Sequence, residues 1–265
     1  MDRLVLVKGG GELATGVAHR LHKEGFKVVI VEKEKPTAER RTTSFAEAVY
    51  TGEHEVEGVK AKLAKTIEDV YRILGEGKIP VVTSLETLAG LKPSVVVDAR
   101  MAKRNLDTRI DEAPLVIGLG PGFKAGVDVH VVIETKPGPD LGKPILSGEA
   151  LPSDGVPPSI AGRTFERLLV SPASGEFKAV KRIGERVEAG EVVGFVEGKP
   201  VRSKISGLIY GLVHDGVKVK AGKKIGDLIP AEIPLEEGLK MIHHISDRAR
   251  AMGEAVLRAI QMLRG

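Results

Sequence analysis

The chain has 265 residues, of which 42% are hydrophobic, a formal net charge of +4 and no cysteine. This is enough material for about two domains with a sizeable core. The lack of cysteine excludes disulfides, thiolate metal ligands and a cysteine nucleophile. No stretch approaches the roughly 20 apolar residues of a membrane-spanning helix and no signal peptide is apparent, so we expect a cytoplasmic protein. The basic residues are scattered along the chain and form no cluster that would indicate nucleic-acid binding.

The first feature along the chain is a strand, a glycine-rich turn and a helical pattern. The apolar run of residues 4–7 precedes Gly9, Gly10 and Gly11, and helical spacing follows. The pattern Gly9-x-Gly11-x-x-Ala14 matches the dinucleotide fingerprint, in which the first glycine makes the turn and the second lets the backbone approach a pyrophosphate. The third small residue lets the helix pack closely on the strand. The alternative is a turn that needs its glycines for backbone geometry alone.

A second apolar run, residues 27–31, ends in Glu32. An acidic residue about 20 positions after the glycines is where a ribose hydroxyl would be held. The sequence therefore predicts a Rossmann-like fold with Gly9, Gly11, Ala14 and Glu32 as cofactor-binding residues. Just beyond, Arg40 and Arg41 are candidates for an anionic substrate or a second phosphate, with a solvated basic loop as the alternative.

The first half continues with alternating strand and helix patterns. Thr66 and Asp69 form a capping box that predicts a helix through residues 70–74. Further strands are expected at residues 79–82, 95–98, 115–117 and 129–133. This alternation favours a mainly parallel α/β sheet.

Two loops at strand ends are the next candidates, because ligands of open α/β sheets bind beyond the carboxyl ends of the strands. The first begins at Asp98 and includes Lys103, which are the best acid and base candidates; the alternative is a structural ion-pair cluster. The second contains Gly118, Gly120 and Gly122, which could offer a nest of backbone amides to an anion or make a tight loop.

The second half has a different design. Residues 136–160 are rich in glycine and proline, which indicates a boundary between two domains. In residues 171–229, Ser174-Gly175 and Ala189-Gly190 recur 32 positions later as Ser206-Gly207 and Ala221-Gly222. Two such halves are expected to stack into a small β barrel-sandwich.

This repeat resembles the biotinyl/lipoyl hammerhead fold. Lys199 occupies the hairpin where that family carries its lysine, but the flanking methionines are missing. A non-carrier relative used for interaction or for covering the first domain's site is therefore expected. The predicted domains are thus 1–165, Rossmann-like; 166–231, biotinyl/lipoyl-like; and 232–265, a C-terminal helical segment.

The chain resembles the YqeB family over nearly its whole length, in the segments Lys8 to Ala18, Val31 to Pro36, Val97 to Ala99, Gly118 to Phe123, Val132 to Thr135 and Ser246 to Ala251. That family is associated with the selenium-dependent molybdenum hydroxylase system. Longer members carry an N-terminal part resembling XdhC, a molybdenum-cofactor chaperone, and this chain resembles a short form without that part.

The resemblance implies an accessory protein that matures a selenium-dependent molybdenum hydroxylase and binds a phosphate-bearing cofactor or nucleotide at the glycine turn. The expected ligand is a dinucleotide or a molybdopterin-type cofactor, and the expected partners are the hydroxylase or its maturation proteins. No metal site is predicted, and the oligomeric state stays open, with a homo-oligomer among the alternatives. The alternative functions are an NAD(P)-dependent oxidoreductase and a ligand-free interaction scaffold.

Overall fold

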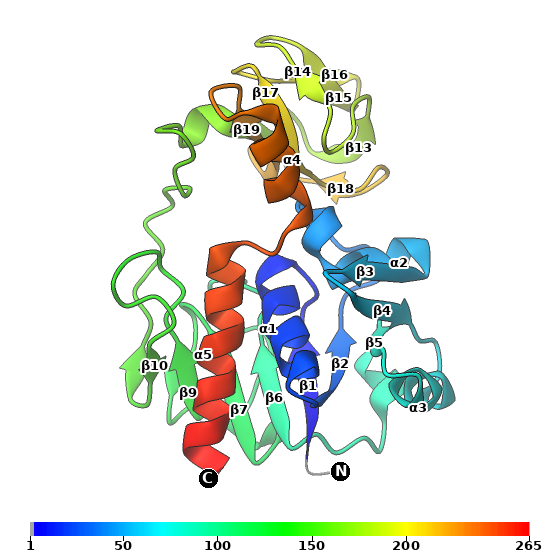
Figure 1. The fold of residues 1–265 in the computed structure, drawn as a ribbon, viewed down its shortest axis with the longest axis vertical. Helices are drawn as coiled ribbons and strands as arrows, with labels where there is room; N and C mark the ends of the chain where they lie inside the picture. Colours follow the sequence, from blue (N-terminus) through cyan, green and yellow to red (C-terminus); the bar gives the residue numbers. More distant parts are fainter. Residues whose placement is uncertain (1–2, 265) are drawn as a thin grey trace. The chain divides into compact units, whose positions relative to one another are not determined.

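A computed structural model describes residues 3–264, which group into two compact units. Unit 1 consists of the chain up to Glu34, Ser44–Asp154 and the chain from Ile245 on, and unit 2 of Lys35–Thr43 and Gly155–His244. This grouping cuts across the predicted ranges 1–165, 166–231 and 232–265, because the two C-terminal helices fall into different units. The chain therefore passes between the units more than once (Figure 1).

Unit 1 is built on a mixed sheet in the order β10-β9-β7-β6-β1-β2-β5-β4-β3. Its strands are β1 (Leu4–Lys8), β2 (Lys27–Val31), β3 (Glu53–Val56), β4 (Val59–Leu63), β5 (Ile79–Val82), β6 (Val95–Asp98), β7 (Leu115–Leu119), β9 (Val131–Ile133) and β10 (Pro144–Ile145). The pairs β3–β4 and β9–β10 are antiparallel, whereas β1 runs parallel to both β2 and β6. A small antiparallel pair, β8 (Lys124–Ala125) and β11 (Gly148–Glu149), lies outside this sheet.

Helices cover both faces of the sheet. They are α1 (Glu12–Lys23), α2 (Ala48–Thr51), α3 (Ile67–Gly75) and α5 (Asp247–Arg264). Because side chains alternate along a strand, Val5 and Val7 join the core that includes α1 and α5, whereas Leu4 and Leu6 join the core that includes Val70 of α3. The Thr66 cap of α3 is confirmed, since Thr66 Oγ1 accepts from Asp69 N at 3.2 Å, but the Asp69 carboxylate accepts from Lys65 N at 3.1 Å instead of completing the capping box.

Helices α1 and α5 lie side by side over the sheet (Figure 1). Two glycines make this approach possible. A Cβ added to Gly16 would clash with the carbonyl oxygen of Ala249, and one added to Gly253 would lie 2.5 Å from the carbonyl oxygen of Gly16. The backbones are therefore nearly in contact, and no larger residue fits at Gly16 without moving a helix.

The fold class expected from the sequence, a Rossmann-like mainly parallel sheet followed by a biotinyl/lipoyl hammerhead-like domain, is wrong. Regular alternation of strand and helix stops after β5, because the connections β5–β6 and β6–β7 carry only the 3-10 turns Leu85–Leu88 and Ile110–Glu112. The second helix beside α1 comes instead from the C-terminal part of the chain. The architecture is a large mixed sheet with separate antiparallel sheets and a closing C-terminal helix.

Unit 2 contains two antiparallel sheets, in the orders β12-β19-β17-β14 and β16-β15-β13-β18. Its elements are β12 (Leu168–Val170), β13 (Gly175–Ala179), β14 (Arg186–Val187), β15 (Val192–Val196), β16 (Lys199–Arg202), β17 (Gly207–Leu212), β18 (Lys218–Val219), β19 (Lys224–Pro230) and α4 (Leu235–His243). Two 3-10 turns, Arg41–Thr43 and Phe165–Arg167, also belong to it.

The 32-residue repeat is present in the hydrogen bonds of unit 2. Ser174 Oγ accepts from Ala221 N at 3.0 Å, and its counterpart Ser206 Oγ accepts from Ala189 N at 3.1 Å. The two halves thus exchange equivalent bonds, each holding a turn of the other. Each of these serine hydroxyls therefore finds its amide donor in the other half of the repeat.

A cluster of charged side chains is buried in unit 2. Asp227 and Arg167 are 0% and 1% exposed, and Arg167 Nη1 donates to Asp227 Oδ2 at 2.9 Å. Lys224 Nζ lies 3.1 Å from the same oxygen and 2.5 Å from Glu39 Oε2. Arg40 stacks on the ring of Tyr210 and lies 3.6 Å from Asp227. This cluster attaches the segment Lys35–Thr43 to β17 and β19.

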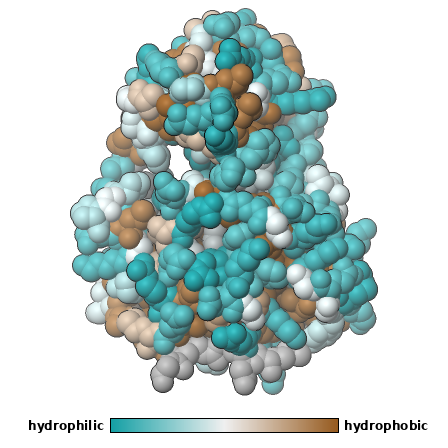
Figure 2. Space-filling view, viewed as in Figure 1, coloured by the Kyte–Doolittle hydropathy of each residue, from teal (hydrophilic) through white to brown (hydrophobic). Residues whose placement is uncertain are grey.

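Hydrophilic residues cover most of the face shown in Figure 2, and apolar residues appear there as scattered patches. Among the described residues, no helix combines the length and the apolar character needed to cross a bilayer.

Candidate functional site

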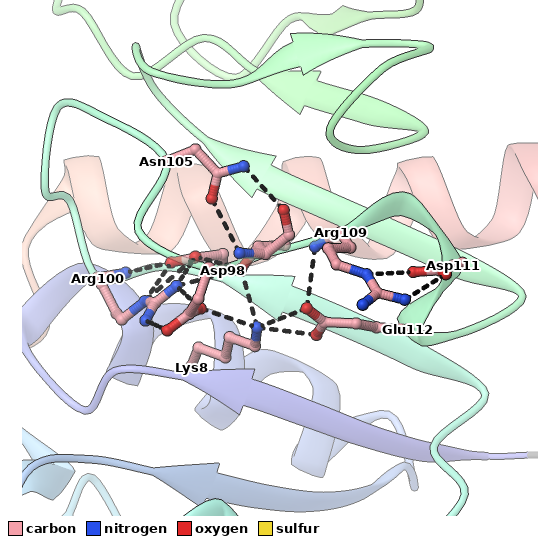
Figure 3. A network of polar contacts seen from close by, with 9 residues as sticks. Lys8, Asp98, Arg100, Asn105, Arg109, Asp111 and Glu112 are labelled. Carbon is pink, nitrogen blue, oxygen red and sulfur yellow. Dashed lines mark hydrogen bonds and ion pairs between the residues drawn. The ribbon is translucent and has the colours of Figure 1, made fainter.

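The carboxyl end of the unit 1 sheet carries a network of charged side chains centred on Lys8 and Asp98 (Figure 3). Lys8 ends β1 and Asp98 ends β6, and the two residues are partners in the parallel ladder. Both are buried, with 3% and 1% of their surface exposed. A charge at the end of a buried strand requires compensation, and the loop after β6 supplies it.

Lys8 is fully bonded. Its Nζ donates to Thr108 Oγ1 and to Glu112 Oε1, both at 2.9 Å, and lies 3.3 Å from Asp107 Oδ1. An ammonium has three donors, and each of them has a partner here. Lys8 is therefore held as a structural cation, with no donor left for a ligand.

Asp98 is equally engaged. Its Oδ2 accepts from Thr108 Oγ1 at 2.7 Å and from Arg100 Nη2 at 2.6 Å, while its Oδ1 accepts from the Arg100 backbone N at 3.1 Å. A general base needs a free lone pair within reach of the proton it removes. The structure places Asp98 in the structural ion-pair cluster that the sequence offered as the alternative to a catalytic role.

Arg100 connects Asp98 to Asp107, with its Nη2 2.6 Å from Asp107 Oδ1. Burial alone would lower the pKa of Arg100, but its bonds to Asp107 and Asp98 outweigh this effect and raise it. The hydrogen bonds from Arg100 lower the pKa of Asp107 to about 2, against a smaller opposite effect of burial. Together with Lys8 and Glu112, these residues comprise two cations and three carboxylates, so the network carries no surplus positive charge.

This coupling predicts the titration of Asp107. We expect its carboxyl carbon to titrate near pH 2 in an NMR pH series, because the ionised form is held by Arg100. The variant Arg100→Gln should raise the midpoint toward the ordinary value of about 4, while Lys8 still holds part of the decrease. Asp111, an exposed carboxylate paired with Arg109 outside the central network, serves as the internal control that should not move. A midpoint near 4 in the unmodified protein would contradict the geometry.

The glycine turn lies next to this network. Gly9 has a φ of +98°, and an added Cβ would lie 3.2 Å from Arg100 atoms. The Gly10 carbonyl oxygen accepts from Ala46 N at 2.8 Å, and Gly10 N donates to Glu32 Oε2 at 2.8 Å. Gly9 and Gly10 are thus fixed by the protein itself, and Glu32 caps the turn.

Gly11 differs from its neighbours. A Cβ built on it would meet nothing within 4 Å, and it stands at the N-cap of α1 without a side-chain cap. Ala14, the third small residue of the motif, is fully buried in the core under α1. The open part of the turn is therefore the face of Gly11 and the first turn of α1.

The glycines of the second loop make close contacts. A Cβ on Gly118 would lie 2.6 Å from the ring of Phe123, and one on Gly120 would lie 2.6 Å from Thr135 Oγ1. Gly122, with a φ of +107°, packs against the backbone of Arg104. These glycines fit the tight-loop alternative that the sequence left open.

Lys103 is exposed and has a φ of +60°, and Met101 in the same loop has a φ of +55°. Left-handed conformations of residues with side chains are costly and cluster at functional sites. Arg40 and Arg41, the other predicted anion-binding residues, lie in unit 2, where Arg41 Nε donates to the Leu212 carbonyl oxygen at 2.9 Å.

Sequence reasoning missed most of the network. The sequence analysis did not select Asp107, Thr108 or Glu112, because these partners of Lys8 lie 99 to 104 positions away from it in the chain. The signal that could have found them is Lys8 itself, because a lysine at the end of a buried strand requires acceptors nearby. In residues 3–264, no group of three or more histidine, aspartate or glutamate side chains is arranged to hold a metal ion.

The chain is 43% identical over 263 residues to the uncharacterized protein YqeB of Escherichia coli strain K12. The chain is a relative of YqeB. The alignment covers 98% of this chain and 48% of YqeB, so the chain spans about half the length of that curated relative. This similarity supports the family resemblance, but the name states no function, and a link to a selenium-dependent molybdenum hydroxylase is not shown. No family model matches the chain.

Among solved structures, similarity is found to an aspartoacylase family protein of Mesorhizobium loti, with 12% identity, 86% and 84% of the two chains covered and a TM-score of 0.26. A succinylglutamate desuccinylase of a Silicibacter species has 14% identity, 85% and 84% coverage and a TM-score of 0.25. The Rossmann, nucleotide-binding and biotinyl/lipoyl-like descriptions expected from the sequence are withdrawn, and the fold correction rests on the strand order and connections described above. At such TM-scores these similarities transfer neither activity nor site residues to this chain.

Proposed function

We propose that the protein is an accessory protein that binds a phosphate-bearing small molecule at the open face of Gly11, without converting it. The observation that carries this proposal is the contrast along the turn. Gly9 and Gly10 are packed, whereas Gly11 faces open space at the uncapped start of a 12-residue helix. The backbone amides that begin a helix and the helix dipole favour an anion at such a position.

The charged groups beside the turn support binding over catalysis. Lys8 donates to Thr108 and Glu112, and Asp98 accepts from Thr108 and Arg100. With their hydrogen-bonding groups engaged in this way, neither side chain is available to move a proton. Lys103, like its neighbour Arg104, is an exposed cation in this loop that could approach a bound phosphate. We propose that Lys103 helps to hold the ligand, and its predicted role in acid-base chemistry stays a prediction.

The proposal predicts loss of anion binding in Gly11→Asp. Titration of the ¹⁵N-labelled protein with inorganic pyrophosphate should shift the amide signals of Gly11, Glu12 and Leu13, and Gly11→Asp should weaken this binding at least tenfold, because a carboxylate would occupy the open space. Gly75→Asp adds the same charge at another glycine with nothing within 4 Å of an added Cβ and should bind like the unmodified protein. An unchanged affinity in Gly11→Asp, or no shifts at these amides in the unmodified protein, would leave the ligand-free scaffold as the better function.

A change at Glu32 gives a second test of the proposed anion binding. Its carboxylate accepts from Gly10 N and places a negative charge beside the turn. Glu32→Gln keeps an acceptor and removes the charge, so pyrophosphate should bind several-fold more tightly. Weaker binding would show that Glu32 contributes through its charge to the site.

The role in maturing a selenium-dependent molybdenum hydroxylase stays a prediction from the family resemblance. It requires that activity of such a hydroxylase falls in cells whose only copy of the protein carries Gly11→Asp, while the Gly75→Asp copy supports full activity.

A further inference from the structure

The segment Lys35–Thr43 belongs to unit 2, while the residues on either side of it belong to unit 1. Before the segment, Glu32 Oε2 accepts from Gly10 N at 2.8 Å, and after it Ala46 N donates to the carbonyl oxygen of the same Gly10 at 2.8 Å. The chain is therefore fixed on one residue of the glycine turn at both ends of the segment. We call Lys35–Thr43 the strap.

The tip of the strap, Glu39 and Arg40, meets β17 and β19 through charged groups. Glu39 Oε2 lies 2.5 Å from Lys224 Nζ. Arg40 stacks on the ring of Tyr210 and lies 3.6 Å from Asp227 Oδ2. The attraction between charges in such a partly buried contact is offset by the hydration that each group loses. When the strap leaves the sheet, water hydrates these groups again.

Asp227 lies at this contact and is bonded on one side only. Its Oδ2 accepts from Arg167 Nη1 at 2.9 Å and from Lys224 Nζ at 3.1 Å. Its Oδ1 is buried and has no hydrogen-bond partner within residues 3–264. A buried acceptor without a partner costs free energy, because it has lost its bonds to water. The closed strap is therefore destabilised at Oδ1, and entry of water would remove this effect.

Gly211 of β17 places the strap beside this unpaired oxygen. A Cβ built on Gly211 would lie 2.9 Å from Asp227 Oδ1 and 3.2 Å from the carbonyl carbon and oxygen of Glu39. Next to it, Leu212 N donates to the Glu39 carbonyl oxygen at 2.8 Å, and Arg41 Nε donates to the Leu212 carbonyl oxygen at 2.9 Å. These bonds break when the strap leaves β17, so the Leu212 amide reports on the strap.

We propose that the strap opens as a local unit, while the sheets of unit 2 and the glycine turn stay folded, and that it controls access to Tyr210 and Asp227. Both are buried while the strap is closed, with 5% and 0% of their surface exposed. The strap contains no strand of either unit, so its opening breaks the contacts of the tip and leaves the strand ladders intact. Loops with fixed ends and a movable middle serve as lids over binding surfaces.

Native-state hydrogen exchange of the full chain tests the proposal at two neighbouring amides. Leu212 N is bonded to the strap, whereas Val213 N donates to the carbonyl oxygen of Ile225 in β19 at 2.9 Å. The protection factor of Leu212 should be at least about 100-fold below that of Val213 and nearly insensitive to dilute urea, because local opening exposes little surface. Equal protection factors with the same urea dependence would overturn the proposal, since the strap and the sheet would then open together.

Two matched variants test the charges at the tip. Glu39→Gln removes the ion pair of the strap and keeps the shape of the side chain, so it should lower the protection factor of Leu212 about tenfold and leave Val213 unchanged. Glu191→Gln removes another ion pair of unit 2, in which Lys181 Nζ lies 2.6 Å from the carboxylate, and should change neither amide. Equal protection of Leu212 in the two variants would show that these charges do not hold the strap and would overturn the proposal.

Ionic strength gives an independent reading of the same contact. Raising KCl from about 0.05 M to about 1 M shortens the range over which charges attract each other, so it should lower the protection factor of Leu212 several-fold relative to that of Val213. The effect should be smaller in Glu39→Gln, which has one ion pair less at the tip. The same salt response in Glu39→Gln and in the unmodified protein would contradict a strap held by this pair.

Discussion

Replacing Gly16 by alanine is expected to lower the free energy of unfolding of unit 1 by about 2 to 3 kcal/mol, at the upper end of overpacking effects. The added Cβ would lie 2.6 Å from the carbonyl carbon of Ala249, which belongs to the α5 backbone and cannot rotate away. The helices must separate, and the apolar contacts between α1 and α5 are lost along their length. Alanine's higher helix propensity returns only about 1 kcal/mol.

The measurement is thermal unfolding followed by far-UV circular dichroism, with an expected fall in Tm of roughly 5 to 10 °C. Gly75→Ala is the control, because Gly75 is another helical glycine of unit 1, the last residue of α3, and an added Cβ there meets nothing within 4 Å. This control should be neutral or slightly stabilising. Equal Tm values for the two variants would show that α1 and α5 are not in backbone contact.

Replacing Asp227 by asparagine should cost about 3 to 5 kcal/mol in unit 2, the range for removing one partner of a buried ion pair. Asparagine has nearly the same shape, so the loss comes from charge: Arg167, 1% exposed, and Lys224 would keep their positive charges without the shared carboxylate oxygen. Glu232→Gln removes an exposed pair with Arg163 and should leave the free energy of unfolding nearly unchanged. Urea unfolding of the two variants gives the comparison.

The same residue makes stability depend on pH. Burial alone would raise the pKa of Asp227, but Lys224, Arg40 and Arg167 together lower it below its ordinary value. A lowered pKa in the folded state means that the stabilisation is fully present above the unfolded value of about 4 and is lost as the pH falls through the folded pKa. Asp227→Asn should lack this part of the acid dependence. A parallel acid profile in the variant would contradict the assignment.

The sequence predicted local elements well because local patterns determine them. Val95 to Val97 form a buried strand, Thr66 caps α3, and the C-terminal helices occur where helical spacing was found. The repeat was also visible, since its markers return at a constant offset. Each of these features depends on residues that lie close together in the chain or recur with a fixed period.

What the sequence did not predict are the contacts between distant segments. Nothing in the spacing around Gly16 indicates that α5 will lie against it, and nothing near Lys8 specifies Glu112 as its acceptor. The glycine motif led to the wrong fold class for the same reason. Gly9, Gly10 and Gly11 look alike in sequence, yet Arg100 and Ala46 from other segments decide that only Gly11 faces open space.

The three-segment composition of unit 1 constrains how the chain folds during synthesis. Unit 2 is complete once His244 has been made, whereas α1, finished at Lys23, has no α5 to cover it until residues 247–264 follow. At typical translation speeds this interval lasts roughly 10 to 45 s, during which the apolar face of α1 is a binding surface for chaperones. Unit 2 therefore has all of its residues before unit 1 does. A premature stop anywhere before α5 leaves unit 1 incomplete, however much of its sheet has already been made.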